Sequence, residues 1–493
     1  MKRVARRTAA ASVVLATLGG AVAGGLQAAP VFQPCRLEDS SRLQAFEAQC
    51  TTLTVPENPA QPGGAKLQLF VARVPAISRR KAPDPLFLLA GGPGMGASTM
   101  YPQIARALRQ IGRTRDLVIV DQRGTGRSTS LACALSDDTL LEGGAAKIAA
   151  ATRECLAQLQ PRRDVTEYTT SVAVQDLDRV RRALGYAQIN LYGVSYGTRV
   201  AQHYLRRFPA STRAVILDGV VPPGLALGPD MAVDAENALT SIFQRCAADP
   251  ACHRAFGDLP AHYLSLRARL QRKPETIELP DPSSGARRKL RFGAAHLGGV
   301  LRLQSYASSQ AALLPFALFA AAERDDFLPL AALFLMTDDG LRDALAYGMH
   351  NSVICSEDIP FVDAARIDRD RLAATYMGTE QIDGLQSICS VWPRGKIDAD
   401  FREPLKSSAP VLLLSGGADP VTPPTNAVKA MAGLTNARHL VLPGAGHGQI
   451  GVACMDRVLA DFLRDAAPAK LNAQCLERVR PEPFFTSAAG PAP

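Results

Sequence analysis

The feature that most restricts the fold of this chain is a G-x-S-x-G pentapeptide between a strand-like and a helix-like segment. Gly193 to Gly197 directly follow the apolar run 189–192. In that setting Ser195 occupies a sharp strand-to-helix turn that lifts its hydroxyl clear of a sheet, and the flanking glycines allow close backbone approach. The pentapeptide alone is also typical of an ordinary glycine turn, so its context decides the interpretation.

Two later loops supply that context. Asp419 follows the apolar run 410–415 and a Gly-Gly-Ala segment, and His447 follows the run 439–443 with a glycine on each side. The order serine, aspartate, histidine is that of the α/β-hydrolase fold and differs from the chymotrypsin and subtilisin orders. We therefore predict a mostly parallel central sheet flanked by helices.

The same three side chains predict nucleophilic catalysis. A serine hydroxyl is a poor nucleophile at neutral pH, so His447 is expected to take the proton of Ser195 during attack and to return one to the leaving group. Asp419 is expected to orient the imidazole. Asp218, which closes the apolar run 214–217, is an alternative acid on a neighbouring strand.

A glycine-rich loop upstream predicts the oxyanion hole. The apolar run 85–89 leads into Ala90-Gly91-Gly92-Pro93-Gly94. This loop does not match a phosphate-binding motif, because no Gly-Lys-Ser/Thr follows and the spacing is not G-x-G-x-x-G. In this fold such a loop supplies one backbone N–H, and the residue after the nucleophile, Tyr196, supplies the other. We assign the first donor to Gly92, with Gly91 left as an alternative.

Three segments of the chain together resemble the proline iminopeptidase and tripeptidyl aminopeptidase family. They are the glycine loop, the pentapeptide and the segment Asp121-Gln122-Arg123-Gly124-Thr125-Gly126-Arg127-Ser128. The resemblance covers most of residues 50–225 and 400–455. It implies a serine exopeptidase that removes residues from peptide N-termini. Ala90 stands where small proline iminopeptidases usually carry histidine, which favours the larger secreted tripeptidyl type. We interpret the Asp121 loop as a structural turn across which Asp121 and Arg123 pair.

An aminopeptidase needs a group that binds the protonated α-amine of its substrate, and a carboxylate does this through a charge-assisted hydrogen bond. Glu357 and Asp358 are the candidates, because the resemblance supports a glutamate in this role and a bridge from Cys355 would hold both acids near Trp392. The alternative is that these two acids cap or solvate a helix end.

The remaining length predicts a second layer over the active site. Residues 226–405 are rich in Ala and Leu and are expected to form a mainly helical cap, with a polar connection at 274–285. Residues 29–225 and 406–480 then form the two parts of the hydrolase core. Residues 481–493 are expected to form a loose tail.

The N-terminus is typical of an exported protein. Lys2, Arg3, Arg6 and Arg7 precede a small and apolar stretch that ends near Ala28, so residues 1–28 are predicted to be a removable signal peptide. No stable membrane insertion is expected after cleavage, and the periplasm and the external medium remain alternatives. The formal net charge of +9 includes Lys2, Arg3, Arg6 and Arg7 of the predicted signal peptide. The remaining positive charge is too scattered along the chain to indicate nucleic-acid binding.

Ten cysteines in an exported chain predict disulfides rather than a metal site, because no C-x-x-C occurs and no cysteine pair lies beside histidines at ligand spacing. Pairing in sequence order gives 35 with 50, 133 with 155, 246 with 252, 355 with 389, and 454 with 475. No cofactor is expected.

The sequence therefore predicts a secreted serine aminopeptidase that acts on short peptides. A carboxylesterase of the same fold is the first alternative, since the same triad hydrolyses esters. A non-catalytic binding module is a more remote one, because no member of the triad is missing. The number of residues released, any proline preference and the oligomeric state stay open.

Overall fold

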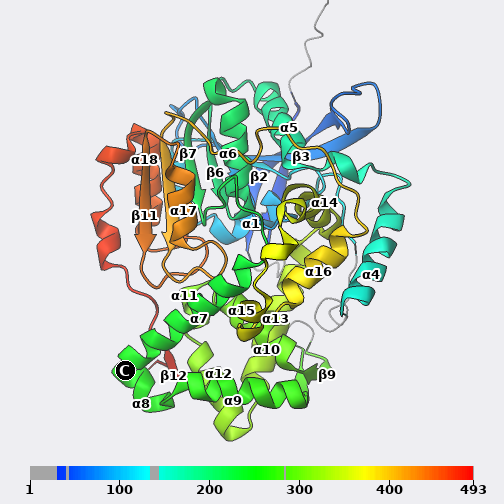
Figure 1. Ribbon diagram of the computed structural model, residues 1–493. Coiled ribbons are helices and arrows are strands. Elements are labelled where there is room, and N and C mark those ends of the chain that lie inside the picture. Colours follow the sequence, from blue (N-terminus) through cyan, green and yellow to red (C-terminus); the bar gives the residue numbers. More distant parts are fainter. Residues whose placement is uncertain (1–29, 40–43, 134–143, 282–284, 492–493) are drawn as a thin grey trace, which may run out of the picture.

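The computed structural model describes residues 30–39, 44–133, 144–281 and 285–491, and a nine-stranded sheet lies at its centre (Figure 1). The strand order is β1-β2-β3-β5-β4-β6-β7-β10-β11. Every pair from β5 to β11 is parallel, and the pairs from β1 to β5 are antiparallel. The antiparallel part comprises β1 (Gln33–Glu38), β2 (Ala45–Pro56) and β3 (Lys66–Val74). The parallel part comprises β4 (Leu86–Leu89), β5 (Leu117–Val120), β6 (Ile189–Val194), β7 (Thr212–Asp218), β10 (Val411–Gly416) and β11 (Ala437–Leu442). The predicted fold class is confirmed.

Helices cover both faces of the parallel strands, which explains why these strands read as unbroken apolar runs. In β4, Leu86 and Leu88 belong to the hydrophobic cluster on one face, whereas Phe87 and Leu89 belong to the cluster on the other. The first face is covered by α1 (Ala97–Ile104) and α18 (Met455–Asp465), and the second by α5 (Thr170–Ala183) and α6 (Tyr196–Arg207). Within the described ranges, no helix combines the length and apolar character that a membrane span requires.

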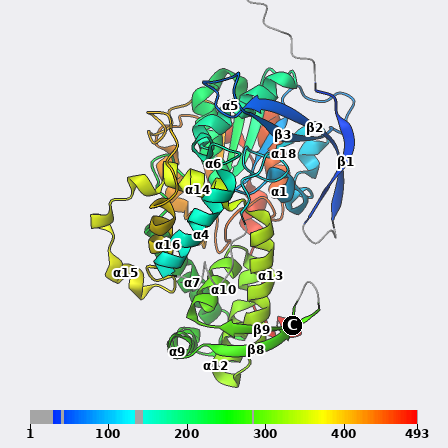
Figure 2. The same ribbon diagram turned by 90° about the vertical axis from the view of Figure 1, so that its right-hand side faces the viewer.

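The cap lies beside the carboxyl edge of the sheet and has its own hydrophobic core (Figures 1 and 2). Leu239, Phe292 and Phe334 are buried in this cluster. Its helices are α7 (Asp230–Ala248), α8 (Pro250–Phe256), α9 (Leu259–Arg272), α10 (Ala294–Gln304), α11 (Ser308–Ala311), α12 (Leu314–Arg324) and α13 (Leu328–Ala344). The segment that we predicted as a polar connection is instead half of an antiparallel hairpin, β8 (Glu275–Pro280) with β9 (Arg287–Phe292). The alternation that we overlooked buries Ile277 and Leu279 and leaves their neighbours outward.

The last part of residues 226–405 packs on the hydrolase core and not on the cap cluster. Met349, Val353 and Ile354 of α14 (Tyr347–Glu357) share the hydrophobic cluster of α5 and α6. The next long helix, α16 (Glu380–Cys389), runs beside α4 (Gly144–Leu159) in both views (Figures 1 and 2). The cap is thus fastened to the core along α14.

The C-terminal segment differs from the loose tail that we expected. Phe485–Ser487 pairs with Gly490–Pro491, and the Phe485 amide donates a hydrogen bond to the Ala312 carbonyl at 3.0 Å. Phe484 is only 3% exposed and lies in the cap cluster. The burial of this aromatic side chain supplies the apolar contact that holds the segment on the cap.

All five predicted disulfides are confirmed, and no cysteine is free. Each bridge joins cysteines that are neighbours in sequence order. The predicted signal peptide, residues 1–28, lies outside the described residues.

Candidate active site

Ser195 lies at the turn between β6 and α6 with a backbone conformation that L-residues rarely adopt, φ 56° and ψ −124°. The small neighbours make this turn possible. A Cβ at Gly197 would collide with the Leu89 carbonyl, and a Cβ at Gly193 would collide with the Gly197 carbonyl. The turn is held by the Ser195 amide, which donates to the Asp218 carbonyl at 2.9 Å. This is the geometry of a nucleophile elbow.

Asp419 and His447 form a hydrogen-bonded pair at the same edge of the sheet. Asp419 follows β10 and His447 follows β11, and these strands are parallel neighbours, so both loops leave the same edge. His447 Nδ1 lies 2.8 Å from Asp419 Oδ2. Asp419 also accepts hydrogen bonds from the amides of Val421 and Thr422, each at 2.8 Å. These donors fix the carboxylate so that one oxygen faces the imidazole.

Burial alone would raise the pKa of Asp419, yet the charge and hydrogen bond of His447 and the two backbone donors hold it below its ordinary value. For His447, burial alone would lower the pKa, and the Asp419 carboxylate outweighs this effect and raises it. The Asp419 carboxylate therefore stabilises the imidazolium form of His447, which general-base catalysis by this histidine would require.

Two features of the His447 surroundings were missed by sequence reasoning. The His447 amide donates to the Tyr306 carbonyl at 2.7 Å, and the Tyr306 ring packs edge-on against the imidazole with centroids 5.1 Å apart. Thr422 Oγ1 lies 2.8 Å from Asp419 Oδ2 and 3.1 Å from His447 Nδ1. No local sequence signal identifies Tyr306, because it belongs to the cap.

Asp218, the alternative acid, has a different set of partners. Its carboxylate accepts from the amides of Gln449 and Ile450 at 2.8 to 3.0 Å and from the Tyr192 hydroxyl at 2.9 Å. Burial raises its pKa to about 6. Asp218 thus anchors the segment that follows His447, and the imidazole bonds to Asp419.

The glycine loop after β4 lies against the Ser195 turn. A Cβ at Gly91 would come 3.0 Å from Ser195 Cβ, so Gly91 packs directly against the Ser195 side chain. Gly92 has φ +110° and is exposed, whereas Gly91 is buried. The loop is held from α14, where His350 Nδ1 lies 3.2 Å from the Pro93 carbonyl. Both glycines therefore remain candidates for the oxyanion donor beside Tyr196.

The side chain of Tyr196 points away from that role. Its hydroxyl lies 2.6 Å from Thr170 Oγ1 and accepts a hydrogen bond from Gln122 Nε2 at 3.1 Å. Burial raises the pKa of this phenol, and the charge of Glu357 raises it further. Only the Tyr196 backbone N–H, at the start of α6, is left to serve an oxyanion.

Glu357 and Asp358 are completely buried and have protein partners. Glu357 accepts from the Thr170 amide at 2.6 Å and from Thr170 Oγ1 at 2.9 Å, so it caps the N-terminus of α5. Asp358 accepts hydrogen bonds from both Nη atoms of Arg199, at 3.1 and 2.8 Å. Burial and the neighbouring Asp358 raise the pKa of Glu357 to about 7, against the opposing effect of Arg199 and Thr170. These contacts correspond to the helix-capping alternative and fasten α14 to the core.

The predicted pairing of Asp121 with Arg123 is wrong. Asp121 accepts from the amide and hydroxyl of Ser98 and from the Arg127 amide, at 2.7 to 2.8 Å. Arg123 is fully buried and binds Asp176 at 2.7 Å. The loop has structural contacts, as expected, but Asp121 and Arg123 each bind other residues and not one another.

A further acid near the site, Asp234 of α7, was also missed. Burial raises the pKa of Asp234 to about 6. The charges of Asp230 and Asp419 act in the same direction, and those of Lys429 and Arg371 act against them. The Asp234 carboxylate is half-buried. Over the described residues, no group of three or more His, Cys, Asp and Glu is arranged to hold a metal ion.

Comparison with known proteins gives the family. Residues 84–249 match the family described as alpha/beta hydrolase fold, and residues 374–475 match the one described as TAP-like protein. The chain is 26% identical to serine protease Hip1 of Mycobacterium tuberculosis over 90% of each chain. It is 28% identical to carboxylesterase B of the same species over 92% of each chain. It is 24% identical to the tripeptidyl aminopeptidase of Streptomyces coelicolor, over 88% of this chain and 84% of the other. The chain is a serine hydrolase of the α/β-hydrolase family, with a TAP-like domain in its C-terminal part.

Proposed function

We propose that the protein is an exported serine aminopeptidase that hydrolyses short peptides near their free N-terminus through an acyl-enzyme on Ser195. The observation that carries this proposal is the 2.8 Å contact between His447 and Asp419 at the sheet edge where the Ser195 turn lies. The serine protease and tripeptidyl aminopeptidase relatives support peptides as the substrate class. The carboxylesterase relative keeps ester hydrolysis as the second candidate.

In the proposed mechanism, Ser195 Oγ attacks the scissile carbonyl and His447 takes its proton. Asp419 holds Nδ1–H and stabilises the imidazolium that forms. The Tyr196 amide and an amide of Gly92 or Gly91 bind the oxyanion, and each such donor is worth roughly 10² to 10³ in turnover. His447 then protonates the leaving amine, and water releases the acyl group by the reverse sequence.

For the substrate amine, the contacts of the two acids of α14 argue against them, and we propose the half-buried Asp234 of α7 instead. Glu357 and Asp358 already accept hydrogen bonds from Thr170 and Arg199, and neither is exposed. The negative charges of Asp230 and Asp419 act more strongly on Asp234 than the positive charges of Lys429 and Arg371, so a bound ammonium would relieve like-charge repulsion. Glu357 and Asp358 would then contribute indirectly, by holding the cap in place.

Export is supported by the basic and apolar N-terminal segment 1–28 and by the five disulfides. Bridges of this number are typical of oxidising compartments. The periplasm and the external medium are both consistent with these features.

The test compares one peptide with a free N-terminus, its N-acetylated form and a simple aryl ester. Asp234→Asn should raise KM about 10- to 100-fold for the free peptide, the size expected for a lost charge-assisted hydrogen bond. It should leave the ester unaffected. Glu154→Gln, which changes an exposed carboxylate on α4, is the matched control.

Faster cleavage of the acetylated peptide than of the free one would refute the aminopeptidase proposal. Efficient turnover of the ester alone would establish the carboxylesterase alternative. Equal losses on peptide and ester in Asp234→Asn would place amine binding elsewhere without affecting the triad.

A further inference from the structure

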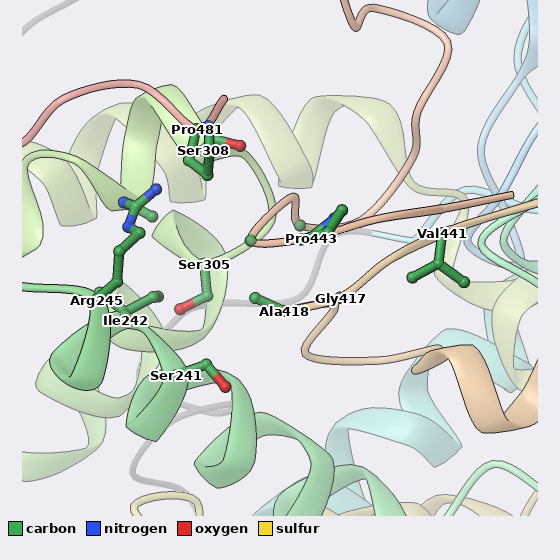
Figure 3. Close-up of a pocket in the computed structure, with 13 residues that line it drawn as sticks. Ser241, Ile242, Arg245, Ser305, Ser308, Gly417, Ala418, Val441, Pro443 and Pro481 are labelled. Carbon is green, nitrogen blue, oxygen red and sulfur yellow. The ribbon is translucent and has the colours of Figure 1, made fainter. Parts of the chain in front are cut away.

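A cavity of about 530 Å³ lies behind the acid and histidine loops, where these loops meet the cap (Figure 3). Its walls come from α7, from the segment 305–311, from Gly417 and Ala418, and from the turn 443–446. Neither Ser195 nor either oxyanion glycine lines it. It is therefore a compartment separate from the proposed catalytic centre, although it shares the two loops that carry Asp419 and His447.

One charged side chain, that of Arg245, lines this cavity, and its hydrogen-bond donors are unsatisfied. All three guanidinium nitrogens of Arg245 are inaccessible and have no hydrogen-bond partner among the described residues. Its guanidinium carbon lies 4.0 Å from the centroid of the Phe484 ring, which shields one face. Burial lowers the pKa of Arg245. The negative charge of Asp249 opposes this effect, without a hydrogen bond to Arg245. A guanidinium presents five donors, and each one left unpaired away from water is costly.

Figure 3 shows where this group lies. Arg245 rises from α7 toward Ser308 and Pro481, at one end of the cavity. The other walls are mainly apolar and include Ile242 and Val441. No second basic residue lines the cavity. The site thus combines one cation with an apolar compartment, which matches a monoanion better than a phosphate dianion.

We propose that this cavity binds a monocarboxylate with a short apolar body. On binding, the Arg245 guanidinium turns from the Phe484 ring into the cavity and pairs with the carboxylate in the two-pronged geometry that guanidinium groups form. The apolar body would lie against Ile242 and Val441. A medium-chain fatty acid and the C-terminal carboxylate of a short apolar peptide both have this chemistry.

A ligand at this position would act on the catalytic loops. Ala418 directly precedes Asp419, and Gly446 directly precedes His447. Ser305, another wall residue, precedes Tyr306, whose carbonyl and ring hold His447. The ligand therefore stiffens the segments that align the acid and the base, and it is expected to change kcat more than KM.

The test is isothermal titration calorimetry on the full mature chain carrying Ser195→Ala, which prevents turnover. Octanoate is compared with octanamide, and an N-acetylated dipeptide acid is compared with its amide. The carboxylate member should bind at least tenfold more tightly than its amide in one pair, and that pair identifies the source of the ligand. Arg245→Met should remove this difference, whereas Arg254→Met, an exposed arginine on α8, should keep it.

Circular dichroism and thermal denaturation control for folding. Arg245→Met should be no less stable than the parent, because a desolvated and unpaired charge is replaced by an apolar chain. Ser308→Phe, which fills the cavity from the segment 305–311, should abolish binding with Arg245 intact. Equal affinity for acids and amides, or binding unchanged in both variants, would overturn the proposal.

Discussion

Substituting the two buried aspartates separately tests which one serves His447, and the contacts set different magnitudes. In Asp419→Asn, the amide oxygen is expected to keep the donors Val421 and Thr422, because Oδ1 accepts both backbone amides. The amide nitrogen then replaces Oδ2 and faces His447 Nδ1. A donor there forces the imidazole proton onto Nε2, where the ring cannot take a proton from Ser195. The expected loss in kcat is about 10⁴, or roughly 5 kcal/mol of transition-state stabilisation.

In Asp218→Asn, the geometry is more forgiving. Oδ2 accepts hydrogen bonds from Tyr192, Gln449 and Ile450. Oδ1 accepts only from the Gln449 amide, which the two oxygens share. An amide oxygen in the place of Oδ2 keeps all three donors. The expected cost is about 1 to 3 kcal/mol of folding free energy, the range for one unsatisfied buried group. The loss in kcat should stay below about 100-fold, because the imidazole keeps its acid.

The assay is kcat on an aryl ester together with the midpoint of thermal unfolding for each variant. The pKa of Asp218 is raised to about 6, so its ionisation removes folding stability from the parent as pH rises from 5 to 8. The stability cost of Asp218→Asn should therefore be larger at pH 5 than at pH 8. A larger kcat loss in Asp218→Asn than in Asp419→Asn would refute the assignment of Asp419 and transfer the acid role to Asp218.

Three further predictions concern the surroundings of the triad. Tyr196→Phe should lose about 1 kcal/mol of stability in chemical denaturation, because the Tyr196 hydroxyl bonds to Thr170. The loss in kcat should stay below tenfold, because the proposed oxyanion donor is the backbone N–H of this residue, and a loss above 100-fold would contradict that proposal. The kcat/KM profile should fall on the acid side with an apparent pKa above 6.5, because His447 must be neutral to act and Asp419 raises its pKa; a midpoint below 6 would contradict it. The pKa of Glu357 is raised from 4.5 to about 7, so its ionisation removes stability as pH rises through that interval. Relative to the parent, Glu357→Gln should therefore gain in unfolding midpoint from pH 5 to pH 8, and a constant difference would show that Glu357 does not titrate there.

Features with a local sequence signal could be predicted, and features that depend on distant neighbours could not. Ser195, Asp419 and His447 each follow a strand and lie among glycines, so the pattern identified their loops directly. The choice between Asp419 and Asp218 depended on which loop points its carboxylate at the imidazole. Both aspartates end buried strands, and only the structure separates the bond to His447 from the bonds to Gln449 and Ile450.

The cap contains the larger errors, for a physical reason. Glu357 looked like a free acid because its partner, Thr170, lies 187 positions earlier in the chain. Phe484 looked like part of a tail because the cap cluster that buries it comes from residues 235–335 and 376. No periodicity or spacing in the sequence predicts the contacts of Glu357 or Phe484, because each contact depends on how distant segments of the chain pack together.

The most direct measurement of the central claim is peptide mapping by mass spectrometry after reaction with an aryl phosphonate. We predict one adduct per chain, on Ser195, with parallel loss of activity. Ser195→Ala should lose about 10⁶ in kcat while its unfolding midpoint stays close to that of the parent. An adduct on another residue, or substantial hydrolysis by a purified Ser195→Ala protein, would contradict the assignment of Ser195 as the nucleophile.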